Sequence, residues 1–394
     1  MAKILIIDST EGKRTPFLRG ILTRSLQAAG LPFEEAFGMA SKIRQELADT
    51  PEITTSELRK MVTRHLNQTY GEATARRYQT PSRAPATILV ERTNQQATPF
   101  SRGELRRSLE CCGLPEEEAM LIVAEIYNHL VGKGIAKISS AELGLMTYRY
   151  LRRELGPDAA KRYLVWADYR HGNRPLLILI GGAPGCGKST LATELATRLD
   201  IVRTQSTDML REVMRVMLPS RLLPVLHTSS FDAWKALPAP VESLTDRNSL
   251  LADGYRTQAE LLSVAAEAVI QRALKERVSL ILEGVHVNPG FLENIPKEAD
   301  AIIVPVMLAV MDPDLLRQRY KGRGQQAPNR RAERYLENFD AIWRLQSILL
   351  SEAERTGVRI VTNDNREKAI QEVMETTINA LTQDFSGTPE EVFV

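Results

Sequence analysis

The fold of this chain is decided by the stretch Leu176-Leu177-Ile178-Leu179-Ile180-Gly181-Gly182-Ala183-Pro184-Gly185-Cys186-Gly187-Lys188-Ser189-Thr190. Its first five residues are apolar and predict a buried strand, and helical periodicity resumes afterwards with Leu191, Leu195 and Leu199. Between strand and helix lies the complete pattern Gly-x-x-x-x-Gly-Lys-Ser of a phosphate-binding loop. This strand–loop–helix context predicts a nucleotide-binding domain.

The residue types of the loop suit a polyphosphate. Gly185 and Gly187 allow backbone N–H groups to approach the phosphates, and the helix that begins near Lys188 points its positive end at them. We expect Lys188 to reach the β- and γ-phosphates and the Ser189 hydroxyl to bind Mg²⁺, and we interpret Cys186 as structural. The residues expected to contact ATP or GTP are Gly182, Ala183, Pro184, Gly185, Cys186, Gly187, Lys188, Ser189 and Thr190.

Four further strands are predicted downstream, with helical runs between them. Because strands and helices alternate, we expect an α/β fold with a doubly wound parallel sheet that binds its ligands at the carboxyl ends of the strands. This domain is predicted to cover residues 173–384. The predicted strands lie at about 201–205, 279–283, 301–308 and 358–362.

Acidic residues after two of these strands favour a kinase over other P-loop proteins. We expect Asp208 to accept the proton of the substrate hydroxyl or to orient Mg²⁺; as an alternative that can hold at once, Asp208 or Thr207 caps a helix that starts near Met209. Glu283 ends a Walker-B-like strand and is expected to orient a water on Mg²⁺ or the attacking hydroxyl. Which of the two acids is the general base stays open. We interpret His286, near the same edge, as structural.

Basic residues are expected both at the acceptor substrate and around the phosphoryl group that is transferred. Arg211 and Arg215 share one face of the helix after Asp208 and suit an anionic substrate, although a solvated face paired with Glu212 is the alternative. A basic segment follows the fourth strand, where P-loop kinases carry a lid that neutralises the transferring phosphoryl group. We expect Arg323 to be its catalytic arginine. The segment contains Arg317, Arg319, Lys321, Arg323, Arg330, Arg331 and Arg334.

The end of the fifth strand, and two motifs that the sequence lacks, bear on the class of P-loop protein. Residues 360–365 are expected to form the adenine pocket. Neither helicase signatures nor the Asn-Lys-x-Asp base reader of GTPases is evident in the sequence. An ATP-dependent small-molecule kinase therefore explains the sequence better than a GTPase or a motor protein.

An internal repeat occupies the N-terminal part of the chain. Thr15-Pro16-Phe17-Leu18-Arg19-Gly20 recurs as Thr98-Pro99-Phe100-Ser101-Arg102-Gly103, and each copy later contains Gly-Leu-Pro and closes on Ala-x-Arg-Tyr. We therefore predict two tandem domains, at 1–80 and 85–168, each with one short strand followed mostly by helix. A linker that contains Pro and Ser joins them near residues 79–85.

The repeat pattern resembles the ATP-cone, a regulatory nucleotide-binding module. The phosphate-contacting turn of that family, of the type Val-x-Lys-Arg-Asp-Gly, is replaced by Ile7-Asp8-Ser9-Thr10-Glu11-Gly12 and by Val90-Glu91-Arg92-Thr93-Asn94-Gln95. An anion site without its cations loses its charge-assisted hydrogen bonds. We therefore expect the copies to be folded relics or oligomerisation modules, and the second case implies a homo-oligomer; nucleotide binding by either copy is the alternative.

The segment between the second and third strands carries the most specific resemblance. Leu226-His227-Thr228-Ser229-Ser230-Phe231-Asp232-Ala233-Trp234-Lys235, together with the motifs around Lys188, Asp208 and Glu283, resembles the 2-phosphoglycerate kinase family over most of 173–380. The resemblance implies ATP- and Mg²⁺-dependent phosphorylation of 2-phosphoglycerate to 2,3-bisphosphoglycerate. The residues expected to bind this small anionic substrate are Arg211, Arg215, His227, Ser230 and Lys235.

Two alternatives to this function stay open. One is the same chemistry on another phosphorylated polyol, such as an inositol phosphate. The other is a non-enzymatic oligomer that senses nucleotides. Phosphoryl transfer to candidate acceptors discriminates between them.

Composition and charge exclude several further classes of protein. The 394 residues carry 51 Lys and Arg against 49 Asp and Glu, a net charge of +2, which excludes a uniformly basic nucleic-acid binder but not a local anion site. Three cysteines cannot form a disulfide framework. The apolar N-terminus is too short for a signal peptide, and the longest apolar run is too short to span a bilayer. We therefore expect a cytoplasmic protein that binds neither membranes nor nucleic acid.

Overall fold

The computed structural model divides into two compact units. One comprises Met1–Arg102 and Ile122–Ser140, and the other comprises Gly103–Leu121 and Ala141–Val394. The structure describes residues 4–7, 14–48, 50–79, 87–92, 97–172, 174–238, 246–295, 299–326 and 332–393.

The second unit contains the predicted parallel sheet. Its strands are β7 (Leu176–Gly181), β8 (Arg203–Ser206), β9 (Leu280–Glu283), β10 (Ile302–Ala309) and β11 (Arg359–Thr362). They lie in the order β11, β10, β7, β9, β8, and every neighbouring pair is parallel. Because β7 is central and buried at each residue, its sequence is an unbroken apolar run. All five predicted strands are confirmed, with ends within two residues of expectation.

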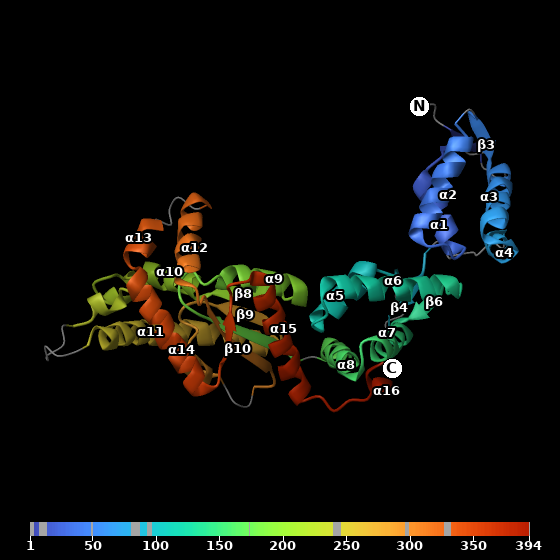
Figure 1. Ribbon diagram of the computed structural model, residues 1–394. Coiled ribbons are helices and arrows are strands. Elements are labelled where there is room, and N and C mark those ends of the chain that lie inside the picture. The colour runs from blue at the N-terminus through green and yellow to red at the C-terminus, as the bar shows by residue number, and fades with distance from the viewer. Residues whose placement is uncertain are drawn as a thin grey trace. The chain divides into compact units, whose positions relative to one another are not determined.

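Helices connect these strands and cover the sheet. The connection from β7 through α9 (Lys188–Leu199) runs outward to β8, whereas α11 (Arg247–Lys275) leads back to β9. Right-handed crossovers in opposite directions place α9 and α11 on opposite faces. The helix α15 (Arg366–Gln383) packs with α9, and α14 (Phe339–Thr356) packs with α11 (Figure 1). The other helices of this region are α10 (Thr207–Met217), α12 (Pro313–Gln326), α13 (Ala332–Glu337), α16 (Pro389–Val392) and the 3₁₀ helices η1 (Pro224–His227), η2 (Ala233–Ala236) and η3 (Pro289–Asn294).

The two N-terminal copies repeat one order of elements. The first copy is β1 (Leu5–Ile7), β2 (Arg14–Pro16), α1 (Arg19–Ala28), α2 (Phe33–Glu46), β3 (Glu52–Thr54), α3 (Thr55–Tyr70) and α4 (Glu72–Gln79). The second copy is β4 (Leu89–Glu91), β5 (Ala97–Pro99), α5 (Arg102–Cys111), α6 (Glu116–Gly132), β6 (Lys137–Ser139), α7 (Ser140–Glu154) and α8 (Pro157–His171).

Each copy has three strands, so the prediction of one strand per copy is wrong. The first strand pairs antiparallel with the second and parallel with the third, in β2-β1-β3 and equally in β5-β4-β6. Each of these strands has three residues, too few for an alternating pattern to stand out in the sequence. The expected linker at 79–85 lies almost wholly outside the described residues.

Within the second unit, helices of the second copy pack against the region of the parallel sheet. The Cys111 thiol donates to the carbonyl of Arg198 at the end of α9, over 3.1 Å. The Tyr163 ring of α8 stacks on Phe393, with ring centroids 6.0 Å apart. Burial raises the pKa of the Cys111 thiol to about 12, so this cysteine is an unreactive packing residue at neutral pH.

Among the described residues, no helix is both long and apolar enough to cross a membrane.

Candidate active site

The phosphate-binding loop connects β7 to α9 at the carboxyl edge of the sheet. Gly187, the residue before α9, has a φ of +95°, and a Cβ atom there would lie 2.5 Å from Asn363 Nδ2, so this position requires glycine. The Lys188 ammonium is buried and donates to the Ala183 carbonyl over 2.9 Å. Because this ammonium group is held by a backbone carbonyl of the loop itself, it lies where a phosphate that enters the loop can contact it.

Ser189 and Glu283 meet at the same edge because β7 and β9 are neighbours. The Ser189 hydroxyl, in the first turn of α9, donates to Glu283 Oε1 over 2.8 Å. The Glu283 carboxylate ends β9 and is 7% exposed. A hydroxyl and a carboxylate beside a phosphate loop are the oxygen ligands that Mg²⁺ prefers. Among the described residues, no group of three or more His, Cys, Asp or Glu side chains could hold a metal ion.

Asp208 follows β8, the strand beside β9. The helix α10 begins at Thr207, two residues earlier than expected, and its N-cap is Ser206, whose hydroxyl accepts from the Asp208 N–H over 3.2 Å. The expectation that Asp208 or Thr207 caps this helix is therefore wrong. The Asp208 carboxylate is exposed, and Arg211 Nη2 lies 4.0 Å from it. Because the cap is Ser206, the carboxylate is left to face the solvent side of the site.

Among the described residues, Arg211 and not Arg215 donates a hydrogen bond to the segment 226–235, which the sequence predicts to bind substrate. Arg211 Nη1 donates to the Thr228 carbonyl over 3.1 Å. Arg215 Nη1 instead donates to both Glu212 carboxylate oxygens, over 2.7 and 3.0 Å, which is the alternative pairing that the sequence left open. The Nε atoms of both arginines are buried and have no hydrogen-bond partner among the described residues.

The three residues of the segment 226–235 that the sequence predicts to bind substrate differ in burial and in their partners. His227 Nε2 donates to the Leu218 carbonyl over 2.8 Å. Ser230 is buried. Lys235 pairs with Asp232 over 2.6 Å, and Arg334 of the predicted lid lies 3.8 Å from the other oxygen of the same carboxylate.

The predicted lid contributes two residues that brace the phosphate-binding loop. Arg319 of α12 donates to the carbonyls of Cys186 and Asn363, over 3.3 and 2.5 Å. The Tyr320 hydroxyl donates to the Pro184 carbonyl over 2.6 Å, and Asn363 Nδ2 donates to the Cys186 carbonyl over 2.7 Å. The sequence did not predict this role for Tyr320 or Asn363. Arg323 lies in α12 with its side chain outside the described residues, as are Arg330 and Arg331.

A buried polar chain lies behind the site. Thr207 Oγ1 is 3.1 Å from His286 Nδ1, and His286 Nε2 is 2.9 Å from Gln258 Oε1. Gln258 Nε2 donates to the carbonyls of Val225 and Thr228, over 2.5 and 3.2 Å. Burial lowers the pKa of His286 to about 3, with Asp208 opposing the shift and the cations Arg211 and Lys188 adding to it. The imidazole is therefore neutral in the folded protein at neutral pH.

This neutral ring makes stability depend on pH. Below about pH 6.5, the ordinary pKa of the ring, the unfolded chain binds a proton at His286 that the folded protein does not bind. The free energy of unfolding should thus fall as pH drops from 6.5 toward 3, by about 1.4 kcal/mol per pH unit from this residue. Chemical denaturation of the wild type and His286→Gln should show the difference between them shrinking at that rate. The same slope in both proteins would contradict a neutral buried ring, and His171→Gln, at an exposed histidine, is the control.

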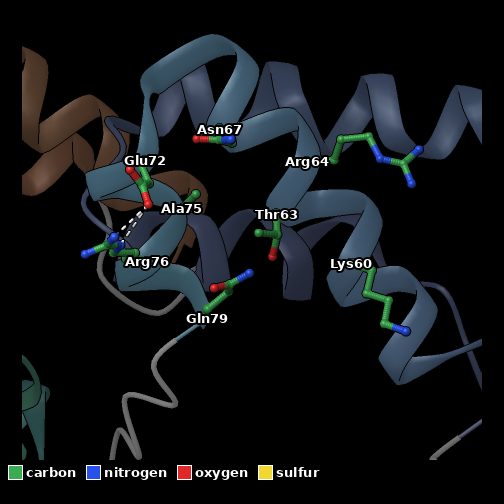
Figure 2. Close-up of a pocket in the computed structure, with 8 residues that line it drawn as sticks. All are labelled: Lys60, Thr63, Arg64, Asn67, Glu72, Ala75, Arg76 and Gln79. Carbon is green, nitrogen blue, oxygen red and sulfur yellow. Dashed lines mark hydrogen bonds and ion pairs between the residues drawn. The ribbon is translucent and has the colours of Figure 1, made fainter.

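A separate hollow lies in the first N-terminal copy, between α3 and α4 (Figure 2). The Arg76 guanidinium points toward Glu72, with which it pairs over 2.7 Å, and away from Lys60 and Arg64. The three cations therefore do not converge on one point in the hollow. Its lining residues are Lys60, Thr63, Arg64, Asn67, Glu72, Ala75, Arg76 and Gln79.

Known proteins resemble this chain over most of its length. The family model of the ATP cone domain matches residues 88–172, and that of the AAA domain matches 178–341. The 2-phosphoglycerate kinase of Pyrococcus furiosus is 37% identical over 287 residues, which cover 73% of this chain and 92% of that protein. The 2-phosphoglycerate kinases of Pyrococcus horikoshii and Thermococcus kodakarensis are 35% and 36% identical over 73% of this chain, and over 92% and 95% of their own lengths.

Proposed function

Because the chain belongs to the 2-phosphoglycerate kinase family, we propose that it transfers the γ-phosphoryl group of ATP to the free hydroxyl of 2-phosphoglycerate, which gives 2,3-bisphosphoglycerate. Identity of 37% over 73% of the chain carries the proposal. The phosphate-binding loop, with its buried Lys188, and the hydrogen-bonded pair of Ser189 and Glu283 support the same chemistry.

Roles at the nucleotide follow from these contacts. Lys188 would leave the Ala183 carbonyl for the β- and γ-phosphates, where its charge stabilises the transition state. Ser189 and Glu283 present oxygen atoms that fit Mg²⁺, directly or through a water molecule. Bound there with ATP, Mg²⁺ would neutralise charge on the phosphates. Arg323 is proposed as the lid cation that meets the transferring group.

At the acceptor, we assign Asp208 as the residue that takes the hydroxyl proton. Its carboxylate is exposed at the edge of the sheet that holds Glu283, and Ser206 already caps the helix. Arg211 and Arg215 would bind the phosphate and carboxylate groups of the substrate through guanidinium groups whose Nε atoms lack partners among the described residues. Lys235, His227 and Ser230 complete the proposed acceptor site, Lys235 by exchanging Asp232 for the substrate.

An acceptor panel tests the proposed function. The full-length protein is incubated with Mg²⁺, ATP and one acceptor at a time: 2-phosphoglycerate, 3-phosphoglycerate, glycerol 2-phosphate or an inositol monophosphate. Mass spectrometry should detect a bisphosphorylated product with 2-phosphoglycerate at the highest rate. Faster transfer to an inositol phosphate would replace the substrate assignment, and no transfer together with ATP-dependent assembly would favour a nucleotide sensor.

We further propose that the chain forms a homo-oligomer through the first N-terminal copy. Four exposed apolar residues of this copy stand where the second copy has mostly polar ones. Ile21 is 65% exposed and Phe33 is 60% exposed, whereas the equivalent residues of the second copy are Glu104 and Glu116. The other two pairs are Leu18 with Ser101 and Phe37 with Met120. Exposed apolar residues that a sister domain lacks are typical of a protein contact.

Changing the first copy toward the second should therefore dissociate the oligomer. We expect sedimentation equilibrium to give a multiple of the monomer mass for the wild type and the monomer mass for Ile21→Glu with Phe33→Glu. Met120→Glu, a matched change in the second copy, should leave the mass of the wild type. A monomeric wild type, or a double variant of unchanged mass, would contradict this proposal.

A further inference from the structure

One buried hydrogen-bond chain joins three elements that flank the proposed acceptor site. It starts at Thr207, next to Asp208 on α10, and passes through His286, three residues beyond Glu283. It then continues through Gln258 of α11 to the carbonyls around η1. The side chains of Thr207, His286 and Gln258 are 1%, 3% and 0% exposed, so water does not compete for these hydrogen bonds.

The direction of every hydrogen bond in the chain is fixed. Carbonyl oxygens only accept, so the amide nitrogen of Gln258 must face Val225 and Thr228, and its Oε1 must face His286. That oxygen also only accepts, so His286 Nε2 carries the hydrogen. In a neutral imidazole Nδ1 is then the acceptor, and Thr207 donates to it. Each group has one role only, and the chain has one arrangement.

Packing leaves this chain no room to shift. The Tyr255 ring stacks on His286 with an angle of 12° between the planes, and its hydroxyl donates to the Val285 carbonyl over 2.7 Å. Gly284 has a φ of +155°, and a Cβ atom there would lie 1.8 Å from Thr207 Oγ1. The loop after β9 therefore lies directly against the first residue of α10.

We propose that His286 is a positioning residue that sets the distance between Asp208 on α10 and the acceptor-binding segment around Thr228. Arg211 and Gln258 donate to the same carbonyl, that of Thr228. The last hydrogen bond of the series therefore also orients a guanidinium group that is proposed to bind substrate. His286 touches neither nucleotide nor acceptor in this role. The inference rests on the proposed function, because it concerns how that acceptor site keeps its geometry.

Two variants break the same hydrogen bond from opposite ends. His286→Gln can place an amide N–H at the position of Nε2, toward Gln258 Oε1, but has no atom at the position of Nδ1 to accept from Thr207. Thr207→Val keeps the shape of the side chain and removes the donor to His286. If the bond positions the acceptor, each variant should lower kcat/KM for 2-phosphoglycerate by about 10- to 100-fold. The KM for ATP should change by less than about 2-fold, since no residue of the phosphate-binding loop takes part in this series of hydrogen bonds.

The double variant separates this role from a general loss of packing. Because both changes remove one bond, Thr207→Val with His286→Gln should lower kcat/KM no further than the worse single variant. His171→Gln, at an exposed histidine, should behave as wild type. Circular dichroism melts establish that each variant is folded at the assay temperature.

Each outcome bears on the inference. Unchanged kcat/KM for 2-phosphoglycerate in either folded single variant overturns it, as do multiplicative losses in the double variant or an equal rise in the KM for ATP. Loss of one limb of the pH–rate profile in His286→Gln overturns it in favour of a catalytic acid or base. A wild type that phosphorylates no 2-phosphoglycerate overturns the proposed function first, and this inference with it.

Discussion

Lys188→Ala is expected to abolish phosphoryl transfer, with kcat/KM reduced by about 10³-fold or more. The Lys188 ammonium is buried and held by the Ala183 carbonyl, and α9 begins at this residue. The loop would lose the buried positive charge that is proposed to contact the β- and γ-phosphates, and water could not replace it at a buried position. The rate of 2,3-bisphosphoglycerate formation under saturating ATP measures the effect.

A matched control separates this loss from unfolding. Lys275→Ala removes an exposed lysine at the end of α11 and should leave transfer unchanged. Thermal unfolding should show Lys188→Ala folded, because alanine also favours a helix at this position. Retention of more than about a tenth of the wild-type rate by Lys188→Ala would contradict the role of the loop in transfer.

Asp208→Asn is expected to lower turnover by about 10²- to 10⁴-fold and to leave the KM for ATP within about 2-fold. The amide has the shape of the carboxylate but cannot take a proton from the acceptor hydroxyl. The helix should survive the change, because Ser206 and not Asp208 provides the N-cap. Steady-state kinetics with each substrate varied in turn separate the two effects.

The chain provides a close control for this variant. Asp253 on α11 has an arginine three residues later, Arg256, as Asp208 has Arg211, and both carboxylates are exposed. Asp253→Asn should therefore reproduce the local electrostatic change without the loss of turnover. Equal losses of turnover and ATP affinity in Asp208→Asn would place this carboxylate at the nucleotide. Glu283 would then be the remaining candidate for the general base.

Local sequence patterns predict the parallel sheet and the edge at which the candidate site residues lie. The apolar run of β7 and the loop after it need only neighbouring residues to be recognised, and parallel strands bring their carboxyl ends to one edge. The order of strands places β9 between β7 and β8. Ser189, Glu283 and Asp208, chosen from separate motifs, consequently lie in the helix after β7, at the end of β9 and in the first turn of the helix after β8.

Contacts between distant segments were beyond sequence reasoning. The bond from His286 to Gln258 joins residues 28 positions apart, and that from Tyr320 to Pro184 joins residues 136 apart. No spacing rule links such residues, since tertiary packing alone brings them together. His286 was interpreted as structural from its isolation in the sequence, and its partners give it a defined place in the site. The sequence likewise left open whether Arg215 pairs with Glu212 or faces the substrate, because side-chain geometry decides between the two.

In the proposed reaction this domain moves the γ-phosphoryl group of ATP onto 2-phosphoglycerate. A single turnover with ATP that carries ¹⁸O in its γ-phosphoryl group tests it most directly, with ³¹P NMR and mass spectrometry of the product. We predict one molecule with two phosphates, labelled on the newly formed ester and unlabelled at carbon 2. Label found only in inorganic phosphate, or on an acceptor other than 2-phosphoglycerate, would contradict the claim.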